Sequence, residues 1–373
     1  MKMPSRRSLA IAISLASMVA VAAPAWAQAQ DYGVGRQSMR DKREAARAAK
    51  KADQPEVVQQ YPLATREEPE ERASRKGVKK LQAMQETFQA GDAAATLAAA
   101  RAIYEDPDSN AYEKAFAYQV AGNAAANEGD TATAVDMFTR ALEANGLDNN
   151  NHYTVMFNLA VTQYGQDKFA EALQTLDRFI AETKADKPEV YSLRGGLLMS
   201  LERYADAAAL YAEQMAKHPD DRTLRMNAVA AYQANDQMDE AAELLAAAQA
   251  RGQLTDPNEY RALYVTYINA DRDKDAIAVI EQGLASGVLQ PSPQLAKDFM
   301  VLGQKAYFAS DDATAVEMYT RAASMAADGE ASLNLAKIHA ENGRKAEAKA
   351  AAQAALDKGV KDADDARKLL GGG

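Results

Sequence analysis

The sequence predicts an all-α protein, a right-handed α-solenoid of about eight helix-turn-helix repeats that follows a flexible N-terminal segment. Two observations support this prediction: from about Arg75 onward the chain is alanine-rich and helical in pattern, and one alanine recurs every 33 to 39 residues. The recurring alanines are Ala134, Ala172, Ala207, Ala241, Ala276, Ala315 and Ala348. A single helix pair buries little apolar surface, so such units become stable by stacking on their neighbours.

Two further positions recur at a fixed distance from these alanines. A turn residue stands five positions before each alanine, and a residue that is usually small stands twelve before. The turn residues are Gly129, Asp167, Glu202, Asp236, Asp271, Ser310 and Gly343. The residues at the second position are Gly122, Ala160, Gly195, Val229, Tyr264, Gly303 and Ala336. We expect the small residues to lie where the two helices of a pair approach each other closely.

This arrangement resembles the tetratricopeptide repeat (TPR), whose signature is W-x2-L-G-x2-Y…A-x3-F…P over about 34 residues. The residues that match best are Tyr191, Gly195, Tyr204, Ala207, Tyr211 and Pro219. The resemblance covers residues 75–373. A degenerate earlier unit is expected from Leu81 to Pro107, with Gly91 at its turn, and a polar capping helix is expected at the C-terminus.

Residues 1–27 have the features of a secretory signal peptide. Three basic residues among the first seven precede an apolar run from Leu9 to Ala23, and Ala25-Trp26-Ala27 forms a small-x-small cleavage site. We therefore expect cleavage near Ala27 and location in the periplasm of a Gram-negative cell, by general or twin-arginine export, with no stable membrane span afterwards. The alternative is an uncleaved anchor, for which the apolar run is short.

The sequence of residues 28–74 predicts a flexible linker that is basic and contains prolines. They show no apolar periodicity, and Pro55, Pro62 and Pro69 interrupt them. In an alternative interpretation, the basic arm Arg36–Lys51 contacts anionic lipid or an acidic partner.

The composition excludes disulfides and thiolate metal sites, and it argues against one class of partner. The chain has no cysteine, so neither disulfides nor thiolate metal ligands are available. The formal net charge is −10, and residues 83–373 alone carry −17 because residues 1–82 have an excess of seven positive charges. An acidic body of this kind argues against nucleic acid as a partner.

The sequence offers no catalytic or cofactor motif, so we expect neither an enzyme nor a bound cofactor or metal. It contains no HExxH, CxxC or phosphate-binding glycine loop. We expect His152 and His218 in solvent-exposed loops between helix pairs and His339 on a packed helix face. Adjacent aspartates such as Asp220–Asp221 and Asp311–Asp312 are expected at helix starts, where they favour the helix dipole.

The TPR resemblance implies that a partner segment binds in the groove lined by the first helix of each pair. The candidate groove residues are Asn123, Asn127, Asn158, Tyr164, Gly196, Met199, Asn227, Gln233, Arg261, Gln304 and Tyr307. Their amide, hydroxyl and thioether groups suit main-chain hydrogen bonds and adaptable apolar contact. We expect Gly195 to serve helix packing, whereas Gly196 would leave bare backbone on the groove floor.

Two narrower types of TPR protein are relevant to this sequence. TPR proteins that clamp a C-terminal carboxylate use cations at positions occupied here by Gln119, Glu189 and Leu193, so this type is excluded. The order of residues from Tyr112 to Ile180 is similar to that of exported TPR proteins associated with TonB systems. That resemblance implies a non-catalytic periplasmic adaptor of TonB-dependent transport. The alternative is an assembly factor for envelope biogenesis or polysaccharide export, and the oligomeric state stays open.

Overall fold

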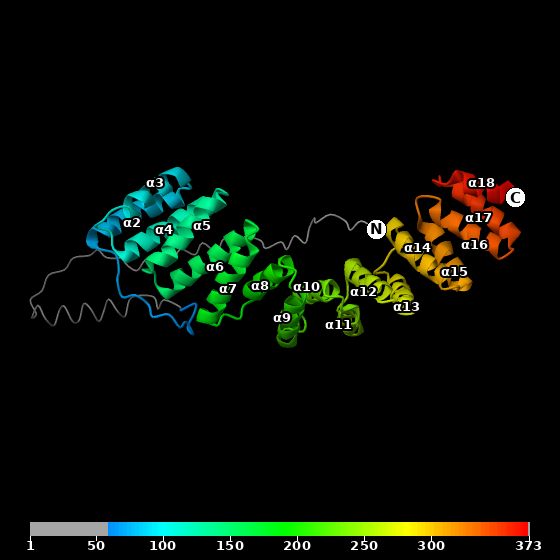
Figure 1. The fold of residues 1–373 in the computed structure, drawn as a ribbon, viewed down its shortest axis with the longest axis horizontal. Coiled ribbons are helices and arrows are strands. Elements are labelled where there is room, and N and C mark those ends of the chain that lie inside the picture. The colour runs from blue at the N-terminus through cyan, green and yellow to red at the C-terminus, as the bar shows by residue number, and fades with distance from the viewer. Residues whose placement is uncertain (1–58, 372–373) are drawn as a thin grey trace, which may run out of the picture. The chain divides into compact units, whose positions relative to one another are not determined.

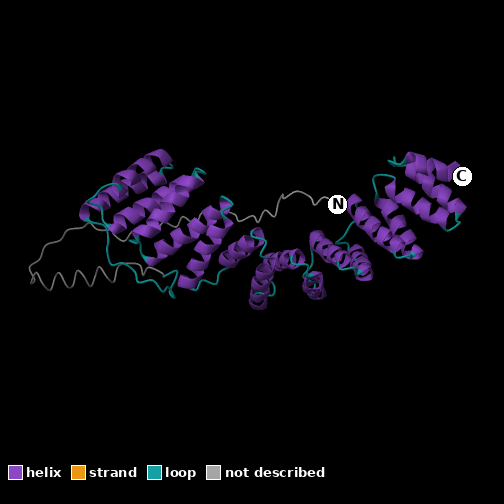
Figure 2. Cartoon of the chain, viewed as in Figure 1, coloured by secondary structure: helices purple, strands orange, loops and turns teal. Residues whose placement is uncertain are grey.

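The computed structural model describes residues 59–371, and its regular structure within that range consists of seventeen α-helices without a strand (Figures 1 and 2). The expected signal peptide and the basic arm Arg36–Lys51 lie outside the described residues. The helices are α2 (Arg75–Gln89), α3 (Ala93–Tyr104), α4 (Ala111–Asn127), α5 (Thr131–Ala144), α6 (Asn149–Gly165), α7 (Phe169–Thr183), α8 (Pro188–Ser200), α9 (Tyr204–Lys217), α10 (Arg222–Ala234), α11 (Met238–Ala250), α12 (Pro257–Asn269), α13 (Asp273–Ala285), α14 (Pro293–Phe308), α15 (Asp312–Met325), α16 (Glu330–Glu341), α17 (Lys345–Asp357) and α18 (Ala363–Gly371).

In chain order these helices are eight successive pairs, from α2–α3 to α16–α17, followed by α18. The predicted all-α repeat fold is confirmed, including the degenerate first pair. The first helix begins at Arg75, where the Ser74 side chain accepts a hydrogen bond from the Gly77 amide and caps the helix.

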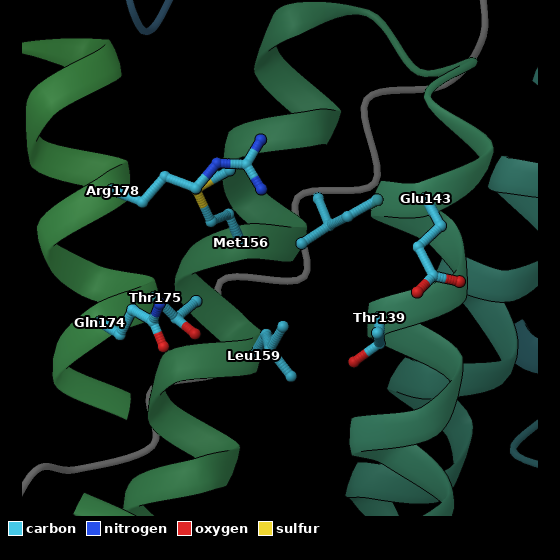
Figure 3. Close-up of a pocket in the computed structure, with 8 residues that line it drawn as sticks. Thr139, Glu143, Met156, Leu159, Gln174, Thr175 and Arg178 are labelled. Atoms are coloured by element: carbon cyan, nitrogen blue, oxygen red, sulfur yellow. The ribbon is translucent and has the colours of Figure 1, made fainter. Parts of the chain in front are cut away.

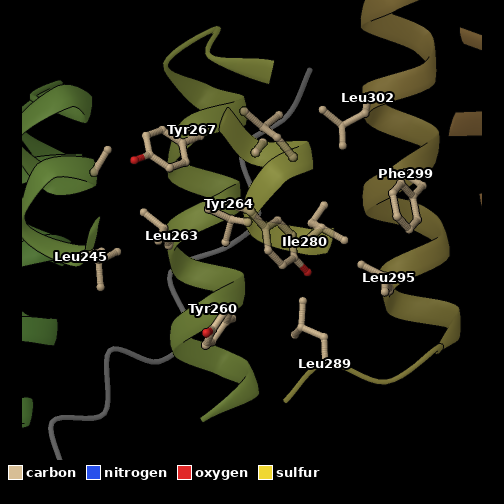
Figure 4. Packing of buried hydrophobic residues seen from close by; sticks show 14 of the residues in the cluster. Leu245, Tyr260, Leu263, Tyr264, Tyr267, Ile280, Leu289, Leu295, Phe299 and Leu302 are labelled. Carbon is tan, nitrogen blue, oxygen red and sulfur yellow. The ribbon is translucent and has the colours of Figure 1, made fainter. Parts of the chain in front are cut away.

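The chain divides into two compact units, described here one at a time. Unit 1 ends at Leu201 and contains α2 to α8, and unit 2 begins at Glu202 and contains α9 to α18. The main core of unit 1 includes Leu81, Phe116 and Phe138. In unit 2 the largest core gathers Leu263, Ile280 and Phe299 with other apolar side chains from α10 to α16 (Figure 4).

Every predicted turn residue adopts the left-handed backbone conformation. The φ angles of Asp167, Asp236, Asp271 and Ser310 lie between 56° and 59°, and Gly91, Gly129, Glu202 and Gly343 are also positive. At these turns the amide of the residue after the left-handed one can donate a hydrogen bond to a carbonyl near the end of the first helix. One example is the Lys168 amide, which donates to the Gln163 carbonyl at 3.0 Å. This Schellman-type ending satisfies free carbonyls of the first helix and turns the chain into the second.

Aspartates cap many of the helices. The side chains of Asp92, Asp130, Asp148, Asp221 and Asp311 each accept an amide hydrogen bond from the first turn that follows. The acidic residues expected at helix starts, Asp221 and Asp311, therefore act as N-caps.

The predicted close approach of paired helices is visible at two glycines. A Cβ atom on Gly122 would lie 2.6 Å from ring carbons of Phe138, and one on Gly303 would lie 3.2 Å from the ring of Tyr319. Phe138 and Tyr319 each stand four residues after a recurring alanine, and all seven of those alanines are buried. The first helix thus leaves room for a large side chain of the second.

The C-terminal end is covered as expected for a stacked array. Helix α18 contributes Ala366, Leu369 and Leu370 to a cluster with Leu333 and Val360, so the last pair is not left with an open apolar face. Within residues 59–371, no helix combines the length and apolarity needed to cross a bilayer.

Residues 59–74, which we call the strap, have no regular secondary structure but lie on unit 1. Arg66 bonds the α5–α6 loop, and Tyr61 packs on rings of α6 and α7. The expectation of a flexible linker up to residue 74 did not include these contacts, because they join segments about 80 residues apart.

The close approach at Gly122 can be tested by a glycine-to-alanine pair. Gly122→Ala forces a methyl group against Phe138, and we expect a loss of about 1–3 kcal/mol of unfolding free energy in urea. The matched control is Gly165→Ala at the exposed end of α6, where nothing lies within 4 Å of the added methyl. That change should be neutral or stabilise by about 0.4–1 kcal/mol. Equal effects of both substitutions would contradict the proposed packing.

Candidate functional site

In unit 1, three of the predicted groove residues carry amides that the fold does not use. Asn123 and Asn127 lie four residues apart on α4, so they share a helix face, and Asn158 lies on α6. Asn127 is exposed, and the other two are half-buried. None of the three side chains makes a hydrogen bond to another described residue, so their donors and acceptors remain available.

Apolar and aromatic groups accompany these amides on α6. Tyr164 is half-buried, with its ring centroid 5.5 Å from that of Phe169. Phe157 is also half-buried and lies 5.6 Å from Phe179. On α8, Met199 is half-buried. Gly196 is buried, so it does not form the bare groove floor that was expected of it.

In unit 2, most of the predicted polar residues serve the fold. Gln233 donates to Thr266 at 2.7 Å, and the Tyr307 hydroxyl donates to Glu341 at 3.0 Å. Each of these contacts joins one first helix to the next. Of the remaining candidates, Asn227 is half-buried and Gln304 is exposed.

Arg261 belongs to a buried node around Asp298. Its guanidinium donates to both carboxylate oxygens, at 3.1 and 3.0 Å, and the Tyr264 hydroxyl donates to the same carboxylate at 2.7 Å. Asp298 is only 7% exposed. Burial, followed by the hydrogen bond to Asp298, raises the pKa of the Tyr264 hydroxyl. The positive charge of Arg261 is thus neutralised within unit 2.

A second node lies one repeat earlier around Glu259, which stands at the same repeat position as Asp298, and sequence reasoning missed both nodes. Arg222 donates to the buried Glu259 at 2.9 Å, and the buried Arg225 lies 3.7 Å from the same carboxylate. Arg222–Glu259 and Arg261–Asp298 share a separation of 37 residues. That repeated arginine-to-acid spacing was the available signal.

A pocket of about 390 Å³ lies between α5, α6 and α7 (Figure 3). Met156 and Leu159 contribute apolar surface, while Glu143 and Arg178 stand on opposite sides. Arg178 is already paired with Glu182 at 2.7 Å. The lining contains one carboxylate and no histidine, so it holds no acid–base pair. Nor do the described residues contain a cluster of acidic or histidine side chains suited to a metal.

The expectation for His152 was wrong. Asp148 caps α6, so the polar run after it forms the first turn of the helix and carries His152 inward, where it is 1% exposed. Neither ring nitrogen has a hydrogen-bond partner among the described residues. Burial, with smaller contributions from Arg66 and Arg178, lowers the pKa of His152 to about 3. His218 is exposed, and His339 is packed as expected.

The Asp298 node should matter more than a surface ion pair. Asp298→Ala leaves Tyr264 and Arg261 without their common acceptor, and we expect a loss of roughly 2 kcal/mol of unfolding free energy in urea. Glu317→Ala, which removes an exposed partner of Arg321, serves as the control and should cost under about 1 kcal/mol. A similar cost for both would show that the node adds no stability.

His152 should make stability depend on pH. The neutral ring is favoured in the folded state, so the unfolded chain binds the extra proton as pH falls below about 6.5. Stability is then lost between about pH 6.5 and pH 3, by up to roughly 1.4 kcal/mol per pH unit. Urea unfolding of wild type and His152→Leu from pH 7 to pH 5 measures this, and the variant should show the shallower slope. Parallel slopes would mean that His152 does not titrate on unfolding.

Comparison with known proteins agrees with the repeat pattern. Two family models, both described as tetratricopeptide repeat, match residues 125–197 and 300–370. A search of curated proteins finds no match. Among solved structures, a tetratricopeptide repeat protein from Parabacteroides merdae is 16% identical, with a TM-score of 0.42, over 68% of this chain and 94% of that one.

Two other solved structures cover a smaller part of the chain. YrrB, described as a TPR protein with an unusual peptide-binding site, is 22% identical over 46% of this chain and 84% of its own, with a TM-score of 0.39. MamA from Desulfovibrio magneticus is 13% identical over 46% and 93%, with a TM-score of 0.38. Two separate stretches of this chain therefore match the tetratricopeptide-repeat family in sequence, in agreement with the turns and helix pairs described above.

Proposed function

We propose that the protein is a non-catalytic periplasmic scaffold that binds a segment of a partner protein on the first-helix face of unit 1. The observation that carries the proposal is the set of unused amides at Asn123, Asn127 and Asn158. Surface amides that the fold does not employ are available to a ligand. TPR arrays serve widely as protein-interaction scaffolds, which supports the same conclusion.

The chemistry of this face favours an extended main chain over a charged group. A carboxamide both donates and accepts, so it can pair with the N–H and C=O groups of a peptide. The aromatic rings of Phe157 and Tyr164 add contact for apolar side chains. Since the proposed contacts are uncharged, we expect binding to depend little on salt.

The signal-like N-terminus supports a periplasmic location, and the resemblance over Tyr112–Ile180 supports a role beside TonB-dependent transport. An assembly factor for envelope biogenesis or polysaccharide export is the alternative. The two differ in the partner: components of a TonB complex in the first case and export or assembly proteins in the second. Fractionation of cells tests the location separately from the partner.

Site-specific photo-crosslinking in living cells tests both the face and the partner. A photoreactive residue at Asn127 should capture a protein that mass spectrometry identifies, whereas one at Gln174, exposed on the second helix α7, should not. Equal capture at both positions, or no protein at Asn127, would argue against the first-helix face.

Affinity measurements with the captured partner then test the amides. Asn158→Ala removes a side chain with no internal partner, so the melting temperature should stay within about 2 °C while affinity falls by about tenfold, or 1.4 kcal/mol. Gln174→Ala is the matched control and should leave affinity unchanged. A loss of affinity that follows a loss of stability would indicate a packing role for Asn158.

A further inference from the structure

The strap runs along unit 1 in the direction opposite to the repeats. Its C-terminal end, at Arg72 and Ser74, contacts the start of α4, and its middle, at Arg66, contacts the loop between α5 and α6. Its N-terminal end reaches α6 and α7, where Tyr61 packs. The strap, which turns once between Tyr61 and Ala64, therefore crosses the starts of two first helices in succession.

Unit 1 binds the main chain of the strap at several points. The Gln60 amide donates to Asn150 at 2.9 Å, and the Thr65 amide donates to the Glu182 carbonyl at 2.9 Å. The side-chain amides of Asn149 and Asn110 donate to the carbonyls of Arg66 and Arg72, at 3.2 and 2.8 Å. Contacts of this kind hold an extended chain whatever its side chains are.

Arg66 and Tyr61 make the most extensive side-chain contacts between the strap and unit 1, and Glu68 adds one hydrogen bond, accepted from the Asn149 amide at 3.1 Å. Arg66 donates to the side-chain oxygens of Asn149 and Asn145 at 2.7 and 2.9 Å, and to the Leu147 carbonyl at 3.0 Å. This arrangement matches the planar fork of a guanidinium, and a lysine could not reproduce it. The α5–α6 loop takes this shape because Asn145 adopts a left-handed conformation with φ of 50°.

Tyr61 is the second recognised side chain. Its ring centroid lies 5.4 Å from that of Tyr153 and 5.6 Å from that of Phe179, both in edge-on geometry, and the Lys187 ammonium lies 5.3 Å from the ring. An aromatic pair in this geometry contributes favourable electrostatic energy beyond the area that it buries.

The strap nevertheless remains on the surface. None of its residues is fully buried, and Leu63, at the tip of the turn between the two recognised side chains, is 66% exposed. A segment held by surface hydrogen bonds and one aromatic contact opens at low free-energy cost compared with a core helix.

We propose that this edge of unit 1 is a binding site for peptide segments without helix or strand that carry an aromatic residue five positions before an arginine, with a turn between the two, and that the chain's own strap is its resident ligand. The site is formed by Asn110, Asn145, Asn149, Asn150, Tyr153 and Phe179. It does not depend on the first-helix face proposed above. A segment of another protein with the same chemistry displaces the strap and takes over its contacts.

A different protein fits this role better than a second copy of the chain. When two copies exchange straps, each gains the contacts that it loses, so nothing offsets the lost translational and rotational freedom. Another protein can add contacts outside the strap site. The strap also acts at a high effective concentration because it is joined directly to α2, so only a strong competitor displaces it.

The full-length chain with Tyr61→Ala and Arg66→Ala, whose strap has lost both recognised side chains, tests the site. A fluorescent peptide of residues 59–74 should bind this variant at least tenfold more tightly than it binds wild type, as measured by anisotropy. Peptides with Tyr61→Ala or Arg66→Ala should bind at least tenfold more weakly than the parent peptide. If circular dichroism shows that the double variant has lost helix, the single variant Arg66→Gln replaces it as the recipient.

Substitutions in the body of unit 1 give the matched control. Asn149→Ala, added to the double variant, should reduce the affinity for the peptide at least tenfold, because Asn149 bonds both the side chain and the carbonyl of Arg66. Asn342→Ala, at an exposed turn of unit 2, should leave that affinity unchanged. Equal binding of parent and substituted peptides would overturn the proposal. The proposal would also be overturned if wild type were a dimer and the double variant a monomer. The strap would then bind a second copy of the chain instead of being displaced by another protein.

Discussion

The helix pairs depend on one backbone constraint, a residue in the left-handed conformation between the first and second helix. Its geometry ends one helix and starts the next within a few residues, which sets where the two helices approach each other. The small residue Gly122 and the large Phe138 then face each other because the turn has placed them there. Several of these turns use Asp, Glu or Ser instead of glycine, so these pairs keep the conformation despite its steric cost.

Features that recur in every repeat could be predicted from the sequence, whereas contacts that occur only once in the fold could not. Turns, buried alanines and small residues were predictable because each recurs at the same position in seven successive units. Arg66 could not be placed, since its partners Asn149 and Leu147 are distant in the chain and nothing repeats around them. His152 was misassigned because a run of asparagines resembles a loop, although Asp148 makes it the first turn of a helix.

The candidate groove residues were predictable as positions but not in their roles. Gln233 carries the same carboxamide group as Asn123 and Asn158, and Arg261 is polar as well, yet the partners Thr266 and Asp298 stand at particular places on the next first helix. Whether a polar side chain is free or engaged depends on that partner. Among the candidate residues, Gln233, Arg261 and Tyr307 of unit 2 therefore join neighbouring first helices, whereas Asn123, Asn127 and Asn158 of unit 1 make no side-chain hydrogen bond to another described residue.

The course of the strap also determines where its own N-terminal end lies on unit 1. Gln60 lies beside Asn150 at the start of α6, although the segment is joined to α2 at Ser74. A probe attached at Gln60 is therefore held at the α6–α7 region instead of at the first repeat. A fluorophore attached there would report on that region, and release of the strap would return it to α2.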